Sequence, residues 1–209
     1  MNAHPGSLTL SKFDRYDFLM ALLCFIGGLA LYIRTLTPGL LPGDSGEFQT
    51  LVYLLGHTHP TGYPVYLVQA KLATYLPLGD VAYRVNLFSA MMGALTVAVV
   101  YLCGRLLVKQ RALAVVGAAA IAVCPTFWSQ AIIAEVYTAR AVFLVLILLV
   151  LLWWDQQESP WALFTAGLLG GLSLGVHMSV ALLAPAVLLF LLPIGGEIRR
   201  CGELLFLAR

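Results

Sequence analysis

The stretch VNLFSAMMGALTVAVVYLCG, residues 85–104, decides the fold class of this 209-residue chain. It contains no Asp, Glu, Lys or Arg, and about 20 predominantly apolar residues are enough for an α-helix to cross a bilayer. Three basic residues follow closely, namely Arg105, Lys109 and Arg111. An uncharged run of this length that ends in a basic cluster predicts a transmembrane helix.

The composition predicts the same class for the whole chain. Hydrophobic residues make up 61% of the sequence and charged residues 11%, whereas soluble domains carry about 25% charged residues. We therefore expect an all-α integral membrane protein that is surrounded by the lipid bilayer. The net charge of +2 gives no reason to expect a nucleic-acid partner. The four scattered cysteines match no disulfide framework or zinc motif.

Apolar runs elsewhere predict six transmembrane helices in a single membrane domain over residues 1–209. The first run lacks a small-residue cleavage site, so we expect an uncleaved span. Residues 64–76 are too few to cross and have one apolar helical face, which predicts a helix lying in the membrane interface. The expected spans are about residues 16–36, 85–104, 112–132, 138–154, 160–176 and 178–194, with a long outer loop at 37–83.

The distribution of Lys and Arg predicts a cytoplasmic N-terminus. With six spans, the cytoplasmic side would carry Lys12, Arg15, Arg105, Lys109, Arg111, Arg199, Arg200 and Arg209. The opposite side would carry only Arg34, Lys71, Arg84 and Arg140. We expect Lys71 and Arg84 to act mainly as interface anchors.

The polar motifs then share the non-cytoplasmic side. They are PGDSGEFQT (42–50) and LGHTHPTGYPVY (55–66) in the first outer loop, IIAEVYTAR (132–140) in the second and GVHMS (175–179) in the third. Ionisable residues concentrated in so apolar a chain mark a functional site. Nucleotide sugars and ATP are cytoplasmic, so a transferase on this side would need a lipid-borne donor such as a polyprenyl-phosphate sugar.

Five segments resemble one membrane family, formerly a domain of unknown function, that includes an animal protein O-mannosyltransferase acting on plexin-type receptor domains. They are PGDSGEF (42–48), LGHTHPTGYPVY (55–66), RVNLFSAMMGAL (84–95), AEVYT (134–138) and GLSLGVHMSV (171–180). The family is similar to the wider GT-C glycosyltransferases. The resemblance implies an inverting glycosyltransferase with a polyprenyl-phosphate sugar as donor and a protein or glycan as acceptor, and mannose is the sugar that the animal member suggests. Family members are longer, so the chain corresponds to an N-terminal module.

The resemblance matches Asp44 to the first-loop acid of GT-C enzymes, which would be the catalytic base. The spacing of Asp44 and Glu47 alone equally suits a capping box at a helix start. Glu47 could orient the acceptor, share a divalent cation with Asp44, or complete that cap. No other cofactor is expected.

The remaining candidate residues are substrate-binding. His57 and His59 could donate hydrogen bonds to the donor phosphate, or bind zinc, or be structural; Tyr63 follows them in a turn stiffened by prolines. Glu135, Tyr137 and Arg140 form a second group, in which Arg140 would neutralise the phosphate or simply pair with Glu135. His177 faces either ligand or a neighbouring helix. Asn86 is expected to hydrogen-bond between helices.

Three other functions stay open on the sequence alone. A scaffold, or an incomplete module that binds a partner enzyme, is consistent with the short chain. A lipid or sugar transporter would place polar residues near the membrane centre, where this chain has almost none. A zinc hydrolase would need a third ligand near His57 and His59.

Overall fold

The computed structural model describes residues 12–157 and 159–192, and every regular element in these residues is helical. This confirms the predicted all-α class. The elements in chain order are α1 (Arg15–Arg34), α2 (Gly43–Leu54), α3 (Pro64–Ala73), α4 (Val81–Leu107), α5 (Arg111–Ala122), α6 (Pro125–Ala131), α7 (Val136–Gln157), α8 (Pro160–Leu174), the 3-10 helix η1 (Met178–Leu183) and α9 (Ala184–Leu191).

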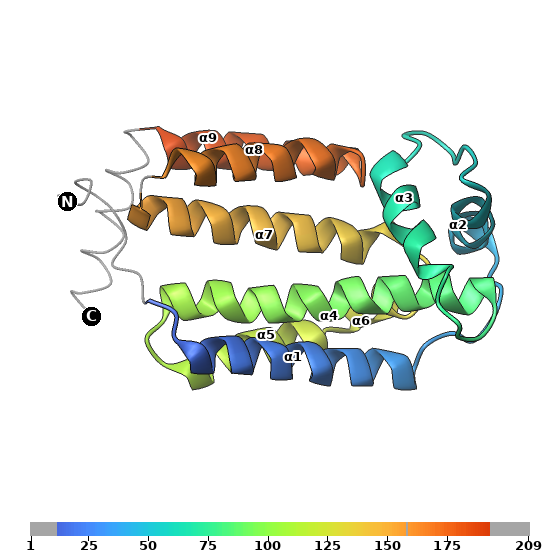
Figure 1. The fold of residues 1–209 in the computed structure, drawn as a ribbon, viewed down its shortest axis with the longest axis horizontal. Helices are drawn as coiled ribbons and strands as arrows, with labels where there is room; N and C mark the ends of the chain where they lie inside the picture. Colours follow the sequence, from blue (N-terminus) through green and yellow to red (C-terminus); the bar gives the residue numbers. More distant parts are fainter. Residues whose placement is uncertain (1–11, 158, 193–209) are drawn as a thin grey trace.

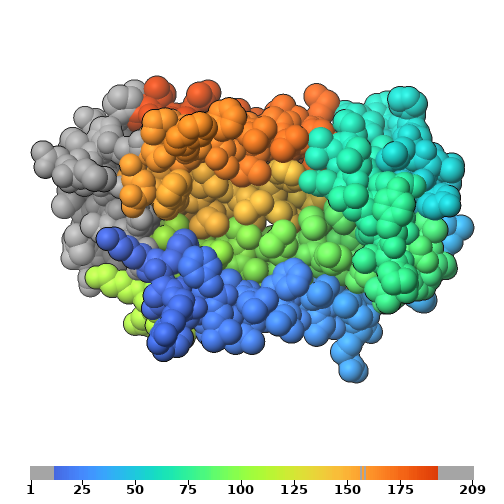
Figure 2. All heavy atoms as spheres, in the orientation of Figure 1, coloured from blue at the N-terminus to red at the C-terminus, as the bar shows by residue number. Residues whose placement is uncertain are grey.

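The long helices lie side by side in a bundle, and α2 and α3 cover one end of it (Figure 1). Helix α4 is the centre, because it packs against α1, α5 and α7. In the most apolar 18-residue stretch of each helix, 67% of α4 is buried but only 22% of α1. Small residues make this packing close: a Cβ on Gly93 would lie 3.1 Å from the Tyr32 ring. The space-filling view shows α2 and α3 covering the end of the bundle without a gap on this face (Figure 2).

The prediction of six spans is wrong, because fewer than six of the described helices are long and apolar enough to cross a membrane. In the described residues, three helices are long and apolar enough to cross a membrane: Arg15–Arg34, Val81–Leu107 and Val136–Asp155. The predicted span at 112–132 is instead two helices, α5 and α6, bent by 65° where Pro125 begins α6, so it makes a fourth crossing only as a broken span. The predicted spans 160–176 and 178–194 correspond to shorter apolar helices, and residues 193 and 194 lie outside the described part.

The end of the bundle opposite α2 and α3 is held by a buried ion-pair network. Asp17 of α1 is fully buried and accepts hydrogen bonds from Arg105 Nε at 2.7 Å and Arg111 Nε at 2.9 Å. Tyr101 donates to the same oxygen at 3.3 Å. Arg105 and Arg111, which the sequence suggested only as orientation charges, therefore join α1, α4 and α5.

Helix α3 has the two faces expected of an interfacial helix. Tyr66, Leu67 and Ala70 are buried, whereas Val68 and Leu72 are 59% and 67% exposed. Lys71 donates to the Tyr53 carbonyl and lies over the Tyr53 ring, so it joins α3 to α2. Its position in the membrane interface stays a prediction.

Arg84 has a structural role in the fold, and its predicted role as an interface anchor stays a prediction. Its guanidinium donates to the carbonyls of Thr74, Leu78 and Gly79 at 2.7–2.9 Å. These three bonds hold the turn between α3 and α4. All three hydrogen-bond acceptors of the Arg84 side chain are thus backbone carbonyls of the segment between α3 and α4.

Candidate functional site

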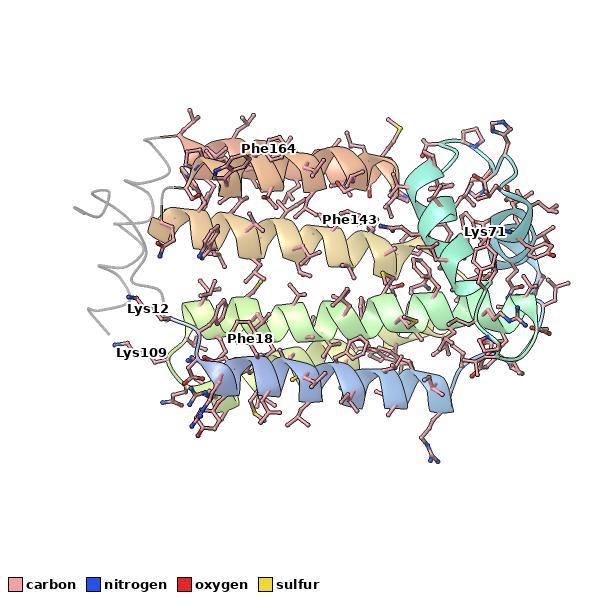
Figure 3. The ribbon with its side chains drawn as sticks, in the orientation of Figure 1. Lys12, Phe18, Lys71, Lys109, Phe143 and Phe164 are labelled. Carbon is pink, nitrogen blue, oxygen red and sulfur yellow. The ribbon has the colours of Figure 1, made fainter. Side chains whose placement is uncertain are left out.

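The polar motifs meet at the end of the bundle that α2 and α3 cover. This end combines α2, α3, the first turns of α4 and α7, and the turn between α8 and η1 (Figure 1). Lys71 lies at this end, and Lys12 and Lys109 lie at the opposite one (Figure 3). The predicted convergence of the three outer segments is therefore seen in the fold.

Asp44 stands exposed in the first turn of α2. The helix begins at Gly43, after extended Pro42, and its first turn closes tightly on Leu41. A Cβ on Gly46 would lie 2.1 Å from the Leu41 carbonyl oxygen, so only glycine fits there. The carboxylate of Asp44 consequently stands at the positive end of the α2 dipole, where an anion is stabilised.

A buried amide pair fixes this helix on α4. Gln49 Nε2 donates to Asn86 Oδ1 at 2.8 Å, and Asn86 Nδ2 donates to the Thr37 carbonyl at 2.8 Å. Gln49 Oε1 accepts the Leu41 N–H at 2.9 Å. The predicted interhelical role of Asn86 is confirmed. The role of Gln49 was missed, although Gln49 stands inside the PGDSGEFQT motif.

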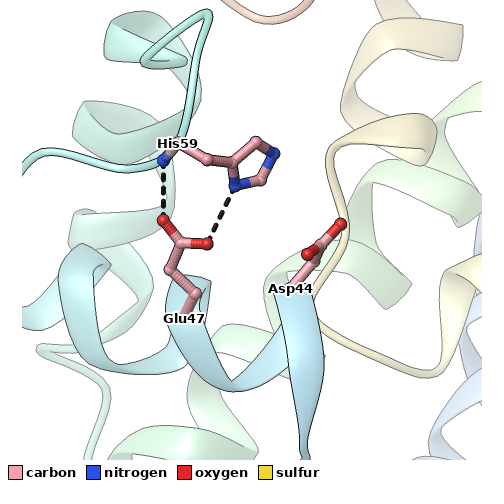
Figure 4. A group of neighbouring side chains, drawn as sticks. All are labelled: Asp44, Glu47 and His59. Atoms are coloured by element: carbon pink, nitrogen blue, oxygen red, sulfur yellow. Dashed lines mark hydrogen bonds and ion pairs between the residues drawn. The ribbon is translucent and has the colours of Figure 1, made fainter.

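Glu47 binds His59 and does not complete a capping box. Its Oε1 accepts the His59 backbone N–H at 2.7 Å, and its Oε2 lies 2.8 Å from His59 Nδ1 (Figure 4). Helix α2 has no side-chain cap, so the capping-box alternative for Asp44 and Glu47 is wrong. The hydrogen bonds from His59 lower the pKa of Glu47, and the bond to Glu47 raises the pKa of His59.

Asp44, Glu47 and His59 also form a set that could hold a divalent cation. One ligand atom from each lies within 4.8 Å of the others. However, both oxygens of Glu47 already bind His59. These bonds hold Glu47 and His59 together without a cation, so we describe the arrangement as a hydrogen-bonded group and assign no metal to it.

Tyr63 connects His59 to the rest of the site. Its hydroxyl lies 3.0 Å from His59 Nε2, and its ring is 8% exposed. Its backbone is left-handed, with φ of 46°, directly before Pro64. The Val65 N–H donates to the Gly175 carbonyl at 2.9 Å, which fixes the turn against the α8–η1 connection.

Glu135 lies beside this group, just before α7. Its Oε1 accepts from Ser45 Oγ at 3.2 Å, and its backbone N–H donates to Ser89 Oγ at 3.2 Å. Burial raises the pKa of Glu135, and the negative charge of Asp44 adds to the rise. Ser45 and Ser89 were missed, although Ser45 stands inside the PGDSGE motif.

Arg140, Tyr137 and His177 form the other half of the site. Arg140 Nη1 donates to Ser179 Oγ at 2.9 Å, and the guanidinium lies 5.0 Å from the centre of the Tyr137 ring. Among the described residues Arg140 makes no ion pair, so the alternative of pairing with Glu135 is wrong. Its Nε is buried and has no hydrogen-bond partner in this part of the chain.

His177 is held in a neutral form. Its Nδ1 accepts the Ser179 N–H at 3.1 Å, which places any single ring proton on Nε2. Burial and the nearby Arg140 lower the pKa of His177. Its ring lies 5.8 Å from that of Tyr63 and 5.9 Å from that of Tyr137. His57, by contrast, is exposed, and its side chain makes no hydrogen bond or ion pair with another described residue.

Comparisons with known proteins identify the family. Residues 44–194 match the family described as the protein O-mannosyl-transferase TMEM260 N-terminal domain. Protein O-mannosyl-transferase TMEM260 of Mus musculus is 29% identical over 155 residues, which are 74% of this chain and 22% of the mouse protein. The Dictyostelium discoideum protein of the same name is 24% identical over 137 residues, 64% of this chain and 17% of that protein.

The chain thus spans about a fifth of the length of these relatives. No solved structure matches it. The family match covers most of the described helices and includes every candidate site residue from Asp44 to His177. The chain belongs to the TMEM260 N-terminal domain family of protein O-mannosyl-transferases.

Proposed function

We propose that the chain carries a mannosyl-transfer site that uses a polyprenyl-phosphate donor and works with inversion on the non-cytoplasmic face. The acceptor is a hydroxyl of a protein or glycan. The names of the two relatives support mannosyl transfer to protein. The activity of this chain by itself is part of the proposal, since the matched residues cover only 22% and 17% of the two relatives.

One observation carries the proposal: an exposed carboxylate lies at the same end of the bundle as a cation that has no acidic partner among the described residues. Asp44 is the exposed carboxylate, and a carboxylate in hydrogen-bond reach can take the proton of an acceptor hydroxyl. Arg140 is the cation, with a buried Nε that has no hydrogen-bond partner among the described residues. A guanidinium in this state favours an anionic ligand, and phosphate matches its geometry.

The roles follow from the chemistry of inversion. Asp44 removes the proton from the acceptor hydroxyl as its oxygen attacks the anomeric carbon. The bond from that carbon to the phosphate oxygen breaks, and the electron pair stays on the phosphate. Arg140 stabilises this growing negative charge, which is where fixed positive groups contribute most. His177, with its proton on Nε2, supplies a neutral hydrogen-bond donor to the phosphate in addition to the charged Arg140.

The expected position of the site at the membrane surface supports a lipid-borne donor. The site lies at the end of helices that are long enough to cross a membrane, so a phosphate head would meet it while its tail stays in the bilayer. Lys12 and Lys109 lie at the opposite end of the bundle (Figure 3). Basic residues favour the cytoplasmic side, which supports a non-cytoplasmic site.

The test is mannose transfer from a labelled polyprenyl-phosphate mannose by the chain in lipid nanodiscs. Asp44→Asn is expected to reduce turnover by about 10²–10⁴-fold, the usual contribution of a general base. Asp80→Asn is the matched control, because Asp80 caps α4 through the Tyr83 N–H and Asn caps a helix equally well. Equal turnover of wild type and Asp44→Asn would exclude Asp44 as the base. Donor binding without turnover in any form would instead favour a non-catalytic module that needs a partner chain.

A further inference from the structure

Tyr63 stands between the two halves of the site. On one side its hydroxyl contacts His59 Nε2 at 3.0 Å. On the other side its ring neighbours His177 at 5.8 Å, and His177 neighbours Tyr137 at 5.9 Å. Tyr137 carries the Arg140 guanidinium over its face at 5.0 Å. An unbroken series of contacts therefore leads from His59 through Tyr63 toward the Arg140 guanidinium.

The hydrogen bond between Tyr63 and His59 can run in either direction. When His59 is neutral and its proton is on Nδ1 facing Glu47, Nε2 is an acceptor and takes the proton of the phenol. When His59 is protonated, Nε2–H donates to the phenol oxygen. The phenol proton is then free for a second partner. The protonation state of His59 thus decides whether Tyr63 offers the site a donor.

We propose that Tyr63 donates a hydrogen bond to the anionic phosphodiester of the lipid-linked sugar, and that Glu47 acts through His59 to keep Tyr63 in the donor form. The inference rests on the proposed function and names a binding residue for its donor. Glu47 and His59 are positioning residues in it, since they act on the substrate through Tyr63. Arg140 and Tyr63 would contact the phosphodiester from the two halves of the site.

The groups around His59 favour its protonated form. Glu47 contacts it directly, and Asp44 and Glu135 add negative charge nearby. All three of these carboxylates raise the pKa of His59. The Tyr63 phenol itself stays protonated, because burial raises its pKa and Tyr137, Asp44 and Glu135 add to the rise. Donation by Tyr63 should therefore hold at lower pH and fade as pH rises through the pKa of His59.

The test is equilibrium binding of a short polyprenyl mannosyl phosphodiester to the chain in nanodiscs, from about pH 5.5 to about pH 8.5, across the titration of histidine. This probe keeps one negative charge throughout, so its own titration does not contribute. Wild type is compared with Tyr63→Phe, His59→Gln and Tyr75→Phe. Tyr75 is 72% exposed and lies outside the site, so it controls for loss of a phenol.

Wild type is expected to lose about tenfold in affinity as pH rises, the value of one hydrogen bond to a charged group. Tyr63→Phe should bind about tenfold more weakly at low pH and show no such step. His59→Gln should also lack the step, and Tyr75→Phe should match wild type. Equal affinity and an equal pH-dependent step in wild type and Tyr63→Phe would overturn the inference. The proposed function would still stand in that case if Arg140→Gln weakens binding. Absence of binding in wild type would overturn both.

Discussion

Glu47 holds His59 with both oxygens of one carboxylate. Oε1 accepts the backbone N–H of His59 at 2.7 Å while Oε2 contacts its ring nitrogen Nδ1 at 2.8 Å. The two residues are 12 positions apart, so this contact fastens the loop after α2 back onto α2. The position of His59, and through it that of Tyr63, depends on a single acidic side chain.

Glu47→Gln is predicted to lower the pKa of His59, because the negative charge that raises it is removed. A pKa raised on folding gives stability that is complete below the ordinary pKa of 6.5 and is lost as pH rises through the folded value. The effect of pH on the Glu47 contribution is the opposite. Its lowered pKa gives stability that is complete above the ordinary pKa of 4.5 and is lost as pH falls through the pKa of Glu47 in the folded state. The pair is therefore strongest in mildly acidic solution.

Histidine NMR titration in detergent micelles measures this effect directly. His177 titrates differently, since burial lowers its pKa. An unchanged His59 titration in the variant would show that Glu47 does not act on the ring.

Gly46→Ala is predicted to distort the start of α2. The new Cβ would meet the Leu41 carbonyl oxygen at 2.1 Å, and a backbone atom cannot rotate away. We expect a loss of about 1–3 kcal/mol in unfolding free energy, as for overpacked sites. Because Asp44 stands in the same turn, turnover should fall as well. Gly39→Ala is the matched control, since nothing lies within 4 Å of its Cβ; equal stability of both variants would contradict the packing seen here.

The sequence predicted the convergence of the motifs because long uncharged runs fix where the chain crosses and so which loops share an end. It did not predict how the loops interlock. The spacing of Asp44 and Glu47 suits a capping box and a loop contact equally, and only the path of the chain around His59 decides between them. The bend at Pro125 was likewise hidden, because α5 and α6 together have the apolar content of one span.

Asp17 was overlooked for a related reason. An acidic residue near the start of an apolar run resembles an ordinary surface charge, yet it is fully buried beneath Arg105 and Arg111. Burial of this kind depends on contacts between residues about 90 positions apart, such as Arg105 with Asp17 at a separation of 88. No local sequence pattern indicates contacts between residues so far apart in the chain.

Asp17→Asn is predicted to destabilise the bundle strongly. The change leaves the buried Arg105 without its acidic partner, and breaking a buried pair in this way costs about 3–5 kcal/mol. Asp14→Asn is the control, because Asn serves as a helix cap and the pair of Asp14 with Arg111 is half-exposed. Unfolding in mixed micelles should separate the two variants clearly. Similar stability of both would mean that the network is dispensable.

The clamp between Gln49 and Asn86 is predicted to hold the site onto the bundle. Both side chains are buried, at 2% and 0% exposure. Asn86→Ala removes the Asn86 acceptor of Gln49 Nε2, which keeps only its 3.3 Å bond to the Gly39 carbonyl, and it removes the donor to the Thr37 carbonyl. Each buried group left unsatisfied costs about 1–3 kcal/mol. Thr165→Ala, which removes only an exposed bond to the Trp161 carbonyl, is the control and should change stability little.

A double-mutant cycle with Gln49→Ala and Asn86→Ala separates this contact from general loss of packing. We expect a coupling energy of about 0.5–3 kcal/mol, the range for residues in one hydrogen-bonded group. Turnover that depends on Asp44 should fall in either variant, because the clamp carries α2. Binding of the phosphodiester probe should fall less, because Arg140 and Ser179 lie on α7 and η1 and do not depend on the clamp. Additive single effects, or equal losses of binding and turnover, would show that the clamp does not position α2 separately from the rest of the site.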